Sequence, residues 1–269
     1  MLVGLFAAAA LLYLIAAVLM LMHLVGVASP QRSPREATAA LGAAVVAHLA
    51  HDVGRWVGAG RGPFAGLHEG LSTLGLLVAA VAFALRLRQR RLETLGAFVA
   101  PLSLLMLLAS RGVDARPATP LSGALLGVHI GSTILGTAAF TVAFALAAAY
   151  LVQEREVRRK RLRGMFQRLP PLEVLDVASF RSVALGLPAL TLGIVTGVFA
   201  GAQEAVGNLG SVLSWRHYLA LAVWAVFAAV MLLRLVAGWR GRRAAIGIIV
   251  GYASAVMVLV GYSMRGAGP

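Results

Sequence analysis

The sequence contains no cysteine, which excludes disulfide bonds, iron–sulfur clusters and thiolate metal sites. Because C-x-x-C-H is therefore missing too, the chain cannot hold a c-type haem covalently. Charge is also scarce, since only 13% of the residues are charged, against about 25% in an average soluble domain. By contrast, 60% of the residues are hydrophobic and the mean hydropathy is +0.86. This composition predicts an integral membrane protein.

Acidic residues are the scarcer sign of charge, with 10 Asp and Glu against 24 Lys and Arg, for a net charge of +14. In a soluble protein that balance would suggest nucleic acid as a partner. Here the basic residues lie in short loops between apolar runs, and membrane topology and anionic lipid headgroups explain this placement better. We therefore expect a lipid bilayer as partner and no nucleic acid.

Eight apolar runs approach the roughly 20 residues that a helix needs to cross a bilayer. They cover about 2–27, 37–56, 64–86, 94–110, 121–152, 179–201, 217–237 and 244–263. The sequence thus predicts an all-α, polytopic membrane protein with about eight transmembrane helices in a single membrane domain, 1–269. The first run is predicted to be a membrane helix and not a cleaved signal.

The basic residues of the loops predict the orientation of these helices. One set of alternate loops holds 18 Lys and Arg, and the opposite set holds 6. Basic loops face the cytoplasm, so both termini are predicted to lie outside. The largest cytoplasmic feature is the basic loop 153–178, in which Pro170 and Pro171 suit the start of a new helix and Asp176 suits its dipole.

Histidines recur at the predicted outer ends of the helices. Ionisable residues in membrane segments are costly and tend to mark functional sites. Five of the six histidines are placed toward the outer side, namely His48, His51, His68, His129 and His217, and only His23 lies at the cytoplasmic end.

Imidazole ligates zinc, copper and haem iron, so these positions are candidate ligands. His48 and Asp52 share a helical face at i,i+4, where Asp52 could orient the imidazole, and Glu69 adjoins His68. Spacing alone leaves zinc open. A haem needs two axial ligands from different helices and cations for its propionates. Arginines at the same face could supply those cations: Arg55, Arg61, Arg111, Arg116 and Arg216. Trp56 and Trp215 could stack on a ligand.

Five stretches of the sequence carry a resemblance to a known family. They are LHEGLSTLGLL (67–77), RLETLGAFVAPLSLLMLLAS (91–110), VHIGSTILGTAAFTVAFALAAAYLVQERE (128–156), LPPLEVLD (169–176) and WAVFAAVMLLRLVAGWRGRRAAIGIIVGYA (224–253). In this order and spacing the chain resembles, over about 64–263, the cytochrome c assembly family of membrane proteins that includes CcsA and CcmC. It looks closest to the HemX-like (YpjD-like) branch.

The resemblance implies non-covalent haem b at the outer face of a bacterial cytoplasmic membrane, and apocytochrome c or other assembly proteins as partners. It implies that His129 and His217 are the axial ligands, with His217 displaced by about two residues and Trp215 in the family's position. His51 and His68 would form another site or line the approach, and Trp215 and Arg216 would contact the haem. Because the loop 201–216 lacks the family's W-G-x-x-W-x-W-D motif, the resemblance does not imply synthase activity.

Two other functions stay open on the sequence. A membrane regulator of tetrapyrrole synthesis would dock a cytoplasmic enzyme through the basic loop at 155–168. A proton-coupled transporter would carry protons on its histidines and would show no haem spectrum.

Overall fold

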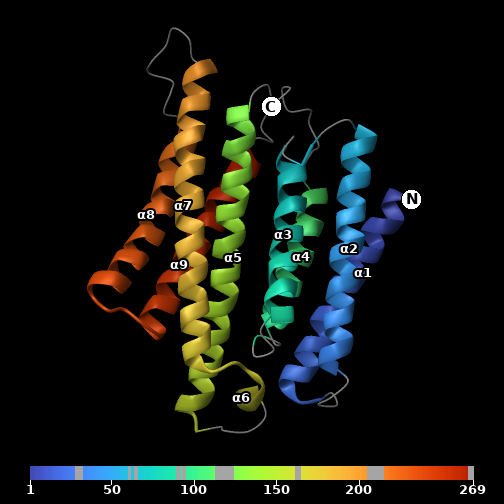
Figure 1. Cartoon of the computed structure of the whole chain (residues 1–269), viewed down its shortest axis with the longest axis vertical. Helices are drawn as coiled ribbons and strands as arrows, with labels where there is room; N and C mark the ends of the chain where they lie inside the picture. The colour runs from blue at the N-terminus through green and yellow to red at the C-terminus, as the bar shows by residue number, and fades with distance from the viewer. Residues whose placement is uncertain are drawn as a thin grey trace. The chain divides into compact units, whose positions relative to one another are not determined.

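The structure, a computed structural model, describes residues 1–27, 33–59, 62–63, 66–88, 92, 95–112, 124–160, 165–204 and 215–265. All regular elements in these ranges are helices, so the predicted all-α class is confirmed (Figure 1). The helices are α1 (Leu2–Val25), α2 (Ser33–Ala59), α3 (Leu67–Arg88), α4 (Gly96–Arg111), α5 (Ala124–Arg158), α6 (Met165–Arg168), α7 (Leu172–Glu204), α8 (Trp215–Val236) and α9 (Arg242–Arg265).

The long helices coincide with the eight apolar runs of the sequence. Within the described residues, α1, α3, α5, α7 and α8 are long and apolar enough to cross a membrane, and α4 is a shorter apolar helix. Large apolar side chains lie exposed on several of them, for example Leu105, Leu185 and Leu232. Such apolar outer surfaces belong in lipid. The chain is a multi-pass membrane protein; the total of eight spans and the outer position of both termini stay predictions.

Helix length and helix ends follow from the local sequence. With 35 residues, α5 is about 50 Å long at 1.5 Å per residue, well beyond a hydrocarbon core of about 30 Å. The end of α1 is set by Gly26, whose φ of +89° favours glycine and whose N–H donates to the carbonyl of Met22 at 3.1 Å. Between α8 and α9, Gly238 and Gly241 both adopt a φ of +65°.

The chain divides into two compact units. Unit 1 comprises 1–118 and 148–175, and unit 2 comprises 119–147 and 176–269. The predicted single membrane domain stays a prediction. In unit 1, the start of α1, the end of α2, the start of α3 and the end of α4 lie at one end (Figure 1). Its core includes Tyr13, Leu41, Val78, Val99 and Leu107.

Unit 2 contains the first two thirds of α5, most of α7, and all of α8 and α9. Its core is built on aromatic contacts, because the rings of Phe140 and Phe227 stack with centroids 3.7 Å apart. Glycines allow α5 and α7 to approach closely, as a Cβ on Gly186 would lie 2.7 Å from the ring of Phe140 and one on Gly136 would lie 3.0 Å from the backbone of Leu190. Three glycines of α7, Gly186, Gly193 and Gly197, lie in such close contacts with α5.

Candidate functional site: histidines at the helix ends

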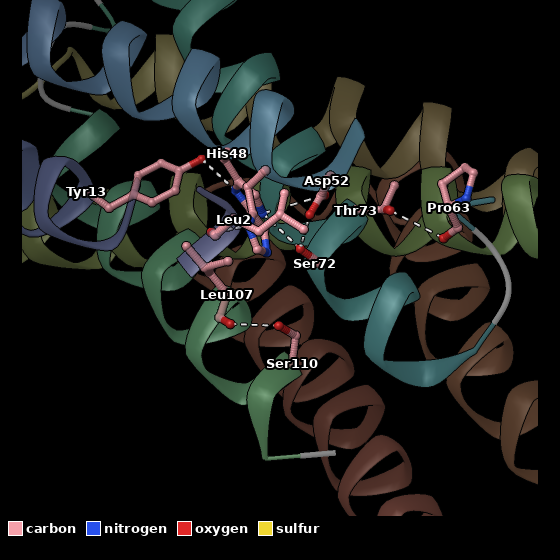
Figure 2. Close-up of polar contacts among 10 residues, drawn as sticks. Leu2, Tyr13, His48, Asp52, Pro63, Ser72, Thr73, Leu107 and Ser110 are labelled. Atoms are coloured by element: carbon pink, nitrogen blue, oxygen red, sulfur yellow. Dashed lines mark hydrogen bonds and ion pairs between the residues drawn. The ribbon is translucent and has the colours of Figure 1, made fainter. Parts of the chain in front are cut away.

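His48, His51 and His68 lie toward the end of unit 1 where α2 ends and α3 begins, which we call the histidine end. A buried network of four side chains lies near it (Figure 2). Tyr13 on α1 bonds to Nδ1 of His48 on α2 at 3.2 Å. Nε2 of His48 lies 3.0 Å from the hydroxyl of Ser72 on α3, and Ser72 donates to Oδ1 of Asp52 at 2.6 Å. His48 is fully buried, and Asp52 is only 2% exposed. Asp52 thus contacts His48 mainly through Ser72, with a direct separation of 3.7 Å between Nε2 and Oδ2.

His51 and His68 lie at the same end of unit 1, and both are buried. Nδ1 of His51 donates to the carbonyl of Leu2 at 3.0 Å, which ties α2 to the start of α1. The ring of His68 bonds to the backbone of Ser110 on α4. The two imidazoles are near enough to interact electrostatically. The structure therefore places these two predicted site residues at the same end of unit 1.

Two arginines complete this end of unit 1. Arg55 donates to Oε1 of Glu69 at 3.3 Å. The guanidinium of Arg111 lies over the ring of Phe6, 4.3 Å from its centroid. Arg61 and Arg116, the other cations expected there, lie outside the described residues.

His129 belongs to unit 2, where it lies near the start of α5 and is partly exposed. Its Nδ1 is 2.6 Å from the carbonyl oxygen of Gly193 on α7. A carbonyl can only accept, so Nδ1 carries the proton, and in the neutral ring Nε2 keeps the lone pair that binds a metal. A backbone carbonyl on the other ring nitrogen is the usual support of a metal-ligating histidine.

A glycine makes room for this imidazole. A Cβ on Gly197 would lie 2.6 Å from Cε1 and 2.7 Å from Nδ1 of His129, closer than real side chains approach. The ring can lie against α7 only because Gly197 has no side chain. The absence of that Cβ and the carbonyl of Gly193, one helical turn earlier, together fix the direction of the ring.

The remaining predicted site residues start α8. His217 lies in its first turn and is partly exposed, and the starts of α5 and α8 lie at the same end of unit 2 as the end of α7 (Figure 1). The pairing of His217 with His129 stays a prediction. Trp215 and Arg216 are the first residues of α8, but their side chains lie outside the described part of the structure.

The opposite end of unit 2 contains an ion pair that the sequence analysis missed. Both oxygens of Asp176 on α7 accept from Arg234 on α8, at 2.8 and 2.7 Å. The backbone N–H of Gly241 donates to the same carboxylate at 2.9 Å. The sequence predicts only that Asp176 suits the helix dipole, and a separation of 58 residues gives no sign of its partner.

The described ranges show no metal site built from several protein ligands. Within them, no three His, Cys, Asp or Glu side chains come together as they would around a metal ion. A zinc site of that kind, which the sequence left open, is therefore not seen in this part of the chain. An iron already held by a porphyrin needs only one or two protein ligands, and His129 suits that requirement.

These features define a class: a polytopic helical membrane protein with histidines gathered at helix ends. The family model for cytochrome c assembly proteins matches residues 65–267, and the chain belongs to that family. CcsA of Synechococcus elongatus, a cytochrome c biogenesis protein, is 30% identical over 302 aligned positions, covering 93% of this chain and 91% of the relative. CcsA of Guillardia theta is 30% identical over 240 positions, covering 80% and 77%. CcsA of Chlamydomonas reinhardtii is also 30% identical, covering 80% and 62%.

The family predicted from the five sequence stretches is thus confirmed, over nearly the same residues. The relatives reported above are CcsA proteins, and assignment to the HemX-like branch stays a prediction.

Proposed function

We propose that this protein binds haem non-covalently at the outer face of a bacterial cytoplasmic membrane and holds it or hands it on during cytochrome c assembly. Membership of the cytochrome c assembly family supports a role in that process, and the relatives are cytochrome c biogenesis proteins by name. The partners would be apocytochrome c or other assembly proteins. Without cysteine, the chain can bind haem b only through coordination and contacts.

The observation that carries this proposal is the hydrogen bond from His129 to the carbonyl of Gly193. It holds the imidazole in the tautomer that leaves Nε2 as the ligand atom, and it increases the basicity of that atom. His217 is the second axial ligand in this proposal. His51 and His68 would form another site or line the approach, and Trp215 and Arg216 would contact the ring and a propionate.

Hemin titration of the purified protein tests the proposal. The wild type should develop a Soret band of bound haem, and His129→Ala should lose most of it because the iron loses its ligand. His217→Ala should convert a spectrum of two axial ligands into one of a single ligand. An unchanged Soret band in His129→Ala would reject the axial role, and a wild type that binds no hemin would reject haem binding altogether.

A glycine pair separates ligation from nonspecific hemin uptake. Gly197→Ala should push the imidazole away from Gly193 and weaken hemin binding about tenfold or more, as loss of a ligand's supporting contact usually does. Gly127→Ala is the matched control, because it lies near His129 on the same helix and its Cβ would meet nothing within 4 Å. We call the carbonyl of Gly193 and the space left by Gly197 the His129 cradle. Equal hemin affinities for the two variants would contradict its role in ligation.

A further inference from the structure

The buried network of unit 1 forms a chain of hydrogen bonds through three helices. It runs from the phenol of Tyr13 to Nδ1 of His48, from Nε2 of His48 to Ser72, and from Ser72 to Oδ1 of Asp52 (Figure 2). Each of the four side chains is at most 2% exposed. Every link joins groups that can both give and accept a proton, apart from the carboxylate while it is ionised.

This network of four side chains has two complete hydrogen-bonding arrangements. With Asp52 ionised, Tyr13 donates to Nδ1, Nε2–H donates to Ser72, and Ser72 donates to the carboxylate. With Asp52 protonated, every bond reverses: Asp52 donates to Ser72, Ser72 donates to Nε2, and Nδ1–H donates to Tyr13. His48 is neutral in both arrangements but changes tautomer. A single proton at Asp52 therefore sets the direction of every hydrogen bond in the network.

One oxygen of the Asp52 carboxyl group takes no part in these hydrogen bonds. Oδ2 of Asp52 is buried, and among the described residues it has no hydrogen-bond partner. An unsatisfied polar atom inside a membrane protein costs free energy, and ionisable residues there tend to mark functional sites. In sequence Asp52 lies two turns before the end of α2, whereas Tyr13 lies halfway along α1. The network thus leads from near the histidine end of unit 1 toward the middle of its helices.

Charged and titratable groups on α2, α3 and α4 lie around the network. Arg55 on α2 and Glu69 on α3 act electrostatically on Asp52, and His51 acts on His48. Arg111 on α4 and His68 on α3 act on His51. Arg55 and Glu69 are already paired with each other, so their charges largely offset at Asp52.

We propose that Tyr13, His48, Ser72 and Asp52 form a proton relay. When a proton from water reaches the phenol oxygen of Tyr13, the phenol proton moves to Nδ1 of His48. The Nε2 proton then moves to Ser72, and the Ser72 proton moves to Asp52, where it neutralises the carboxylate. One proton enters and one is stored, while Tyr13, His48 and Ser72 end with the same number of protons. The reverse sequence releases it. The relay does not depend on haem.

Coupled titration of two of its members tests the relay. Infrared difference spectra of the purified protein would follow the carboxylic acid band of Asp52 against pH, and ¹⁵N NMR of labelled histidine would follow the tautomer of His48. We expect both signals to change with one midpoint, and Asp52→Asn to abolish both. A His48 tautomer that stays constant while Asp52 titrates would overturn the relay.

Serine variants distinguish a relay from a purely structural network. Ser72→Ala should leave Asp52 titrating but uncouple the tautomer of His48, and Ser72→Thr should restore the coupling because it keeps the hydroxyl. Ser110→Ala is the matched control, since Ser110 is a buried serine of unit 1 whose hydroxyl donates to Leu107 of its own helix. Coupling that persists in Ser72→Ala, or that is lost equally in Ser110→Ala, would overturn the proposal.

Discussion

The candidate site residues of the two units are held by different kinds of contact. In unit 1, Tyr13, His48, Ser72 and Asp52 bond to one another, so each has side-chain partners from other positions or helices. In unit 2, His129 depends on one backbone carbonyl, and Asp176 depends on one arginine and one N–H. A network occupies both nitrogens of its imidazole, whereas a single carbonyl leaves one nitrogen with a lone pair. The comparison separates a histidine suited to proton transfer from one suited to ligation.

The ion pair of unit 2 is the place where this comparison predicts the largest loss of stability. Asp176→Ala should lower the free energy of unfolding by about 3–5 kcal/mol, because it leaves Arg234 nearly buried without its bidentate partner. Thermal unfolding in detergent measures the effect.

Glu69→Ala is the counterpart in unit 1. Its partner Arg55 keeps a side chain that is 20% exposed, and the pair has a single contact of 3.3 Å. We expect a loss of no more than about 1 kcal/mol for such a partly solvated pair. Similar losses for Asp176→Ala and Glu69→Ala would show that the bidentate geometry contributes little.

The two histidines predict opposite results for the same substitution. His48→Ala should cost about 3 kcal/mol, since it leaves polar atoms of Tyr13 and Ser72 buried without their partner, yet it should retain hemin binding. His129→Ala should lose hemin binding and less than about 1 kcal/mol of stability, because its ring is only partly buried.

The carbonyl of Gly193 is still satisfied in His129→Ala, because it also accepts from Thr196 at 3.1 Å. Thermal unfolding and hemin titration of both variants give the four values needed. If both variants lost stability alike and both kept the Soret band, the contrast between the two histidines would not hold.

Local patterns in the sequence predicted the helices and part of the site. Apolar runs marked every long helix, and the i,i+4 spacing placed His48 beside Asp52. Nothing local joins Asp52 to Ser72, 20 residues away, or His48 to Tyr13, 35 residues away. These contacts depend on how the helices pack, which periodicity does not specify.

The support of His129 was unpredictable for a different reason. Its partner is a backbone carbonyl, which every residue has, so the sequence carries no mark of it. Gly197 is visible in the sequence, but a small residue in a membrane helix indicates only close helix packing. The structure shows that the same missing Cβ also makes room for the imidazole.

Helix packing in unit 2 gives the last prediction, at a glycine contact between α5 and α7. A Cβ on Gly136 would lie 3.0 Å from the amide of Leu190 and 3.1 Å from the carbonyl of Gly186, and backbone atoms cannot turn aside as a side chain can. Gly136→Ala should therefore push α5 from α7 and cost about 1–3 kcal/mol by overpacking. Gly127→Ala on the same helix has open space and should be neutral or stabilising by up to about 1 kcal/mol, since alanine favours helix. Because α7 also carries Gly193 and Gly197, Gly136→Ala should weaken hemin binding as well. Loss of stability with unchanged hemin affinity would mean that the His129 cradle adapts to movement of α7, and that the ligand does not depend on a single fixed position.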